Sequence, residues 1–167
     1  MRPAGPTQGS NPARRAYLAV IAALLAVIAA LVYAFVVAGS TLPGDDGRTA
    51  VVLAPGERAL VLREMRGFVT GIAQLTDALA RNDMPAAAAA AASMGAGRAH
   101  DVPASLMGRL PIGFKALAFG VHRGFDAMAA DALAIRSRDQ TLAQLAGVLG
   151  QCAACHERYQ IGAAASR

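Results

Sequence analysis

The sequence predicts an all-α protein in which one N-terminal transmembrane helix precedes an antiparallel four-helix bundle. Alanine is abundant, aromatic residues make up only 5% of the chain and tryptophan is absent, a composition typical of helical proteins. One unbroken apolar run lies near the N-terminus, and most of the remaining chain divides into segments with apolar residues at helical spacing. With 167 residues, the chain has room for one domain of ordinary size and an appendage.

The apolar run, residues 16–38, is long enough to cross a bilayer, because a spanning helix needs about 20 apolar residues. Arg14 and Arg15 precede it, so the positive-inside rule places residues 1–15 in the cytoplasm and the rest of the chain outside. A cleavable signal peptide is the alternative, since Val36-Val37-Ala38 is a tolerable cleavage site. Its apolar core would exceed the usual length of about 7–15 residues, so we favour an uncleaved signal anchor.

Residues 39–55 are expected to link the anchor to the bundle, which covers residues 56–162. This linker contains a turn-rich segment, Pro43–Gly47, and a short apolar segment, Val51–Leu53, that can pack locally. The first bundle helix is predicted over residues 56–82, where apolar residues recur at spacings of four and three. Its apolar stripe comprises Val61, Met65, Phe68, Ile72, Leu75 and Leu79.

Three more helices complete the predicted bundle. Pro85 suits the first turn of the second, an alanine helix over residues 86–92. After a loop over residues 100–111, the third helix spans residues 113–136 and the fourth runs from residue 138 to about residue 161. The expected inner stripes are Phe114, Leu117, Val121, Phe125, Met128 and Ala132 on the third helix, and Leu142, Leu145, Leu149, Cys152, His156 and Tyr159 on the fourth.

The last predicted helix carries a motif with specific chemistry, Cys152-Ala153-Ala154-Cys155-His156. Two cysteines separated by two residues and followed by histidine form the attachment pattern of c-type haem. The two thiols add across the vinyl groups of the porphyrin, and the imidazole of His156 then lies under the iron as its proximal ligand. Helical spacing brings Cys152, Cys155 and His156 toward one side. We therefore expect one covalently bound haem c between the helices.

Three other interpretations of the cysteine pair carry less weight. A redox dithiol normally belongs to a strand–helix unit, and the sequence shows no convincing strand pattern. A structural zinc site needs four ligands, but the chain has two cysteines, and His100 and His122 lie far from them without paired spacing. The cysteines can also be small buried residues that bind nothing.

The net charge of +5 is modest, and Arg2, Arg14 and Arg15 of the N-terminal tail contribute much of it. The sequence shows no basic stripe with interleaved aromatic residues. Nucleic acid is therefore not an expected partner.

Four amphipathic helices with CxxCH near the end of the last one resemble class II cytochrome c, the cytochrome c-prime group. The resemblance covers roughly residues 57–160. Class I cytochromes c instead carry CxxCH near the start and place a methionine ligand many residues later, whereas only about ten residues follow His156. One departure from the family is Gln160, at a position that is often basic. Because bacteria attach c-type haem outside the cytoplasm, the resemblance implies a single-pass inner-membrane protein with its haem domain in the periplasm.

In this family the first helix supplies the residue that faces the second side of the iron. Met65 resembles the methionine of six-coordinate members, which transfer electrons, whereas a non-ligating residue leaves an open site that binds small gases. Methionines on apolar stripes usually fill core space, and periodicity leaves that alternative open. Met128, and bis-histidine ligation through His122 or His100, are weaker candidates.

The resemblance implies an electron carrier, not an enzyme, with both cysteines as haem anchors, His156 as proximal ligand and Met65 as distal ligand. The expected partners are the membrane and a redox protein or electron-transport complex, and members of the family often form homodimers through their first two helices. The alternative is a five-coordinate haem protein that binds nitric oxide or carbon monoxide as a scavenger or sensor. Peroxide chemistry has little support, because Glu64 and Arg66 are expected to fall off the inner stripe.

Overall fold

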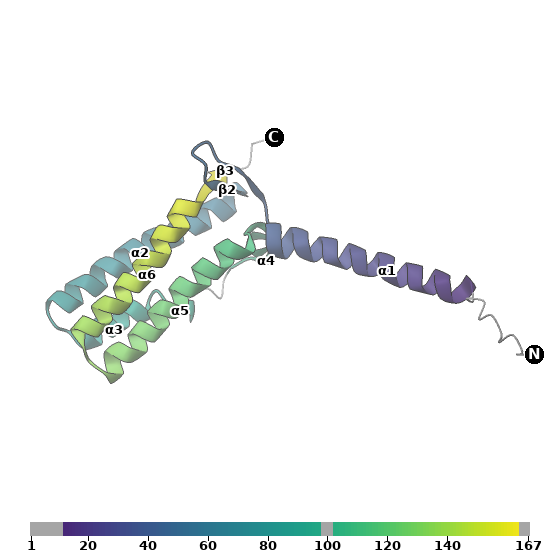
Figure 1. The fold of residues 1–167 in the computed structure, drawn as a ribbon. Coiled ribbons are helices and arrows are strands. Elements are labelled where there is room, and N and C mark those ends of the chain that lie inside the picture. Colours follow the sequence, from purple (N-terminus) through teal and green to yellow (C-terminus); the bar gives the residue numbers. More distant parts are fainter. Residues whose placement is uncertain (1–11, 98–101, 164–167) are drawn as a thin grey trace, which may run out of the picture.

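The computed structural model describes residues 12–97 and 102–163. These residues form six α-helices, one π-helical segment and three short strands. Figure 1 shows α2, α3, α5 and α6 gathered into a bundle, with α1 projecting away from one end of it. The chain is therefore mostly helical with one separate N-terminal helix, as its composition and periodicity predict.

The N-terminal helix, α1 (Pro12–Val32), continues without a break into the π-helical segment η1 (Tyr33–Ala38). Together they form a 27-residue helix, exposed from Pro12 to Val37, which at 1.5 Å per residue spans about 40 Å. The hydrocarbon core of a bilayer is about 30 Å thick, so by length and composition this helix can cross a membrane. The expected tail, residues 1–15, already belongs to α1 from Pro12 on, and its earlier part lies outside the described residues.

The segment expected to be a linker packs on the bundle instead. It contains β1 (Thr41–Pro43) and β2 (Thr49–Leu53), which form an antiparallel hairpin. β2 also pairs in parallel with β3 (Tyr159–Ala163), giving the strand order β1-β2-β3. Val51 and Leu53 are fully buried, as the local packing of this apolar segment predicts. The sheet itself was not predicted, because its strands are short and its parallel pair joins segments from distant parts of the chain.

The four bundle helices lie where predicted, to within a few residues. An additional short helix, α4 (Ala104–Arg109), occupies part of the loop expected over residues 100–111. The last helix ends before the predicted residue 161, because Tyr159 adopts an extended conformation (φ −124°, ψ 148°) and begins β3. The bundle helices are α2 (Pro55–Ala80), α3 (Met84–Ala92), α5 (Ile112–Ala134) and α6 (Arg138–Arg158).

Polar side chains cap the starts of two of these helices. The Asp83 carboxylate accepts a hydrogen bond from the Ala86 backbone N–H at 3.0 Å, at the start of α3. The Ser137 hydroxyl oxygen accepts one from the Gln140 N–H at 3.3 Å, at the start of α6. Each cap satisfies an N–H group that has no partner within its helix, so these residues mark where the chain turns into a new helix.

Three pairs of neighbouring helices in the bundle pack closely, and the fourth pair packs less closely. α2 packs on α3, α3 on α5 and α5 on α6, whereas α2 and α6 make few close contacts. Gly120 and Gly124 of α5 face α6. A Cβ atom at Gly120 would collide with the Gln151 side chain, and one at Gly124 would lie 2.6 Å from Cγ2 of Val148. These glycines therefore let α6 lie tightly against α5.

The inner face of α6 differs from its predicted stripe. Leu142 and Leu149 are 43% and 41% exposed, whereas Thr141, Leu145 and Val148 are buried. Thr141 can be buried because its hydroxyl donates to the Ser137 carbonyl at 2.9 Å, which satisfies the polar group within its own helix. A stripe assigned from apolar residues alone misses such a threonine and places the buried face of the helix incorrectly.

The apolar interior consists of two clusters. The larger lies among α2, α3, α5 and α6, and the smaller joins the sheet, α4 and the starts of α2 and α5. The larger includes Leu75, Leu79, Met84, Met94, Val121, Phe125, Met128, Leu145 and Val148, and the smaller comprises Val51, Leu53, Val61, Leu106, Leu110, Phe114 and Tyr159.

Substituting Leu75 with Ala should lower the free energy of unfolding by about 2–5 kcal/mol, because the fully buried side chain leaves a cavity. The matched control is Leu133→Ala on α5, whose side chain is 62% exposed, and for which we expect a change within about 0.5 kcal/mol. Urea unfolding of the full chain in detergent micelles, followed by circular dichroism, measures both. Equal losses in the two variants would contradict this assignment of the core.

Candidate cofactor site

An apolar cavity of about 100 Å³ lies between the two clusters, among α2, α4, α5 and α6. Cys152, Cys155 and His156 of α6 line it, together with Met65 of α2. The structure thus brings together the four site residues that the sequence predicts. The other lining residues are Val61, Glu64, Phe68, Val102, Leu106, Met107, Leu110, Phe114, Lys115, Leu117, Ala118, Phe119, Val121 and His122.

Both cysteine thiols are half-buried and bridge the two apolar clusters. Cys152 packs against the larger cluster and Cys155 against the smaller one. Burial raises the pKa of each thiol, and the neighbouring Cys152 raises the pKa of Cys155 further. Within residues 12–97 and 102–163, no cluster of three or more His, Cys, Asp or Glu side chains is arranged to hold a metal ion.

His156 lies in the last turn of α6, where its side chain is exposed at the edge of the cavity. Its backbone carbonyl accepts a hydrogen bond at 3.2 Å from Arg48, in the turn between β1 and β2. The Arg48 guanidinium also donates to the Gln160 side chain at 3.4 Å and forms a 2.6 Å ion pair with Asp46. A guanidinium from a distant part of the chain therefore lies beside Gln160.

The methionines divide into those that line the cavity and those that do not. Met65 lines it and is half-buried. Met128, the weaker candidate, is fully buried in the larger cluster and is not among the residues that line the cavity. Met107 of α4 also lines the cavity, and sequence analysis missed it because this segment was expected to be a loop. Met65 and Met107 are thus the two thioethers in position to reach a cofactor there.

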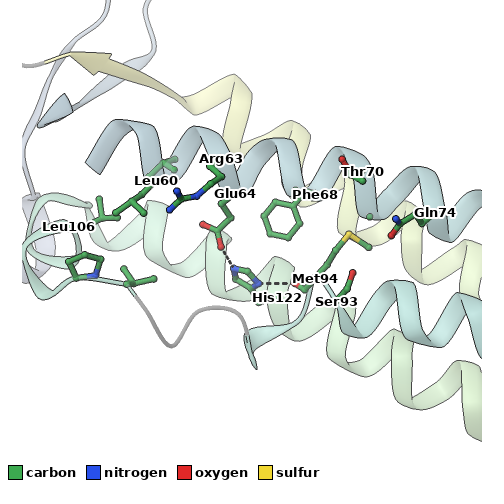
Figure 2. Close-up of a pocket in the computed structure, with 15 residues that line it drawn as sticks. Leu60, Arg63, Glu64, Phe68, Thr70, Gln74, Ser93, Met94, Leu106 and His122 are labelled. Atoms are coloured by element: carbon green, nitrogen blue, oxygen red, sulfur yellow. Dashed lines mark hydrogen bonds and ion pairs between the residues drawn. The ribbon is translucent and has the colours of Figure 1, made fainter. Parts of the chain in front are cut away.

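A larger cavity of about 570 Å³ adjoins the first along α2 (Figure 2). Polar side chains from several elements enter it, including Arg63, Glu64, Gln74 and Ser93. Val61, Glu64, Phe68, Val102, Leu106 and His122 line both cavities.

Buried His122 and half-buried Glu64 form a polar pair that lines both cavities, and Figure 2 shows the two side chains facing each other. His122 is 6% exposed, with Nδ1 2.8 Å from the Met94 carbonyl oxygen and Nε2 3.2 Å from a Glu64 carboxylate oxygen. The hydrogen bond to Glu64 raises the pKa of His122, although burial opposes the shift. Both ring nitrogens are therefore engaged, which disfavours His122 as an iron ligand. His100, the other candidate, lies outside the described residues.

The prediction that Glu64 falls off the inner face of its helix was wrong, since its half-buried side chain lines both cavities. The helical spacing of Glu64 in the sequence already indicated this position. Glu64 follows Val61 by three residues and precedes Phe68 by four, so it fits the helical spacing as well as Met65 does. An apolar pattern alone does not register a carboxylate on an inner face.

A comparison of the chain with protein-family models, with curated proteins and with solved structures finds no match. The chemistry of the site is therefore inferred from its own residues.

The Glu64→Gln variant should lose stability at low pH more than at high pH. The pKa of His122 is higher in the folded chain than in the unfolded chain, where it is about 6.5. The pair therefore gives its full stabilisation at pH values below about 6.5 and loses it as the pH rises through the folded-state pKa. We expect a loss on the order of 1 kcal/mol at pH 5.5 and a smaller one at pH 8.5, measured by urea unfolding. Asp77→Asn, which removes an exposed ion pair with Arg81, is the control, and an equal pH dependence in both variants would refute the linkage.

Proposed function

We propose that the chain is a membrane-anchored class II c-type cytochrome that carries single electrons on the periplasmic side of a bacterial inner membrane. The observation that carries this proposal is the convergence of Cys152, Cys155, His156 and Met65 on one apolar cavity. A covalently bound haem would supply a reversible one-electron couple there.

The sparse contact between α2 and α6 supports the proposal. α2 and α6 make few close contacts, and the middle of the α2 stripe is half-buried at Met65, Phe68 and Ile72. Bundles of this kind place cofactors in the core between facing helices.

Each site residue has a distinct role in the proposal. Cys152 and Cys155, whose thiols lie at the cavity wall, would hold a haem through two thioether bonds. His156 would supply one iron ligand, and Arg48 holds its backbone carbonyl at the end of α6. Met65 would supply the other, and an apolar shell with a methionine ligand would favour the reduced state of the iron.

The anchor and its flanking charge support the proposed location. Arg14 and Arg15 lie at the start of α1, and the exposed apolar helix follows them. The positive-inside rule then keeps this end in the cytoplasm and exports the bundle. The expected partners remain a redox protein or electron-transport complex in the same membrane, and dimerisation remains a prediction.

Replacing either cysteine with Ala should leave one thioether bond, and replacing both should abolish covalent haem. A remaining vinyl group extends the conjugation of the ring, so the α-band of the denatured protein in alkaline pyridine should move to longer wavelength in each single variant. Ala154→Ser, at the exposed residue between the cysteines, is the control and should match the unsubstituted chain. Unchanged bands in both single variants would show that the thiols do not carry the haem.

Met65→Ala should convert the ferric spectrum from low-spin to high-spin and let the ferrous form bind carbon monoxide at once, because the distal ligand is lost. Met107→Ala is the matched control, since it lines the same cavity, and should leave the spectrum unchanged. Optical spectra with and without carbon monoxide measure both. A high-spin, gas-binding spectrum in the unsubstituted chain would instead favour the gas-binding alternative, and an effect confined to Met107→Ala would move the ligand to α4.

A further inference from the structure

We propose that α4 and the first turns of α5 rest on the phospholipid headgroup layer of the membrane that α1 crosses, so that the cysteine end of the bundle faces the bilayer. This inference rests on the proposed membrane anchoring and adds to it a defined docking surface and orientation. The surface, called the junction surface below, consists of Leu42, Arg109, Ile112 and Lys115.

The anchor joins the bundle without a flexible spacer. Gly39, directly after η1, has a φ of +64°, and a Cβ atom there would collide with the Arg109 carbonyl and lie 2.7 Å from the Pro111 nitrogen. The next residue, Ser40, donates its backbone N–H to the Arg109 carbonyl at 2.7 Å. Only glycine at position 39 lets the backbone that follows the anchor lie in direct contact with the end of α4.

Lys115 fixes the depth of α5 relative to the anchor. Its ammonium group lies 3.4 Å from the Phe35 carbonyl and 3.2 Å from the Val36 carbonyl, in the last turn of the apolar helix. The last carbonyls of a helix have no partner within it, and lysines near a bilayer place their charge at the interface. The first turns of α5 are therefore held at the level where the anchor leaves the hydrocarbon core.

The junction surface has the composition of an interfacial one. Leu42 is 59% exposed and Ile112 is 51% exposed, and both lie within a few residues of the Gly39 contact. Lys115 supplies positive charge, whereas the charge of Arg109 is balanced by Glu57, with which it pairs at 2.9 Å. Exposed apolar side chains next to cations bind the headgroup boundary of a membrane, and the anchor holds this surface against it.

The opposite end of the bundle points away from the membrane. α5 rises about 1.5 Å per residue, so Ile135 lies about 35 Å along the helix from Ile112. Figure 1 shows α1 leaving at the α4 end and running away from the bundle. Because Lys115 also lines the cavity that holds Cys155 and His156, the candidate haem site lies near the lipid surface. Its electron-transfer partner is then a component embedded in the same membrane.

The absence of tryptophan from the sequence permits a direct test with single-tryptophan variants of the full chain. Leu25→Trp lies within the anchor, Ile112→Trp on the junction surface, and Ile135→Trp, 52% exposed, at the far end of α5. Each is reconstituted into phosphatidylcholine vesicles, either plain or with brominated acyl chains. The bromines lie close to the headgroup for the Ile112, Leu42 and Ile135 variants and near the chain end for Leu25→Trp, which lies at the middle of the anchor. The ratio of fluorescence in the two vesicles reports lipid contact, and quenching by a bound haem cancels in that ratio.

We expect Ile112→Trp fluorescence to fall roughly twofold in the brominated vesicles, because interfacial side chains penetrate about 5–10 Å into the headgroup boundary, and Ile135→Trp fluorescence to stay unchanged. Leu42→Trp provides a second variant of the junction surface with the same expected result. Quenching of Leu25→Trp without quenching of Ile112→Trp and Leu42→Trp would overturn the docking surface and leave the anchor intact. Quenching of Ile135→Trp as well would overturn the orientation, and failure to quench Leu25→Trp would overturn the anchoring itself.

Discussion

The close packing of α6 on α5 is the constraint on which the candidate site depends. At Gly120 and Gly124, Cβ atoms would meet the Gln151 and Val148 side chains of α6, so these glycines permit the close approach. α6 makes few close contacts with α2. Cys152, Cys155 and His156 of α6 line the cavity together with Met65 of α2.

The small sheet provides a second support for this arrangement. Pairing of β2 with β3 holds the chain directly after α6 against the start of the bundle, and Arg48 bonds to the last turn of the helix at His156. The end of α6 is thus fixed on two sides by residues that follow η1 in the chain. Attachment of the proposed anchor and placement of the proposed proximal ligand are therefore structurally linked.

Helical periodicity predicts the bundle well because each amphipathic helix buries one face, and Phe125 and Leu75 are fully buried as their stripes require. The spacing of Cys152, Cys155, His156 and Met65 likewise predicts residues that do line one cavity. The sequence does not predict the sheet, because β2 and β3 come from distant segments. It also does not predict the buried face of α6, where the Thr141 hydroxyl donates a hydrogen bond to the Ser137 carbonyl of the same helix. It also misses the Glu64–His122 pair, because two polar residues on separate helices meet only after the helices pack.

The central claim is that the two thiols of α6 carry a covalently bound haem, and the most direct test is the intact mass of the denatured protein. The chain would be purified from bacteria that mature c-type cytochromes, and its mass measured after organic solvent has removed any loosely held cofactor. We predict the mass of the chain plus one haem, with no free thiol left to alkylate. The mass of the bare chain with two alkylatable thiols, from cells that mature other c-type cytochromes, would contradict the assignment.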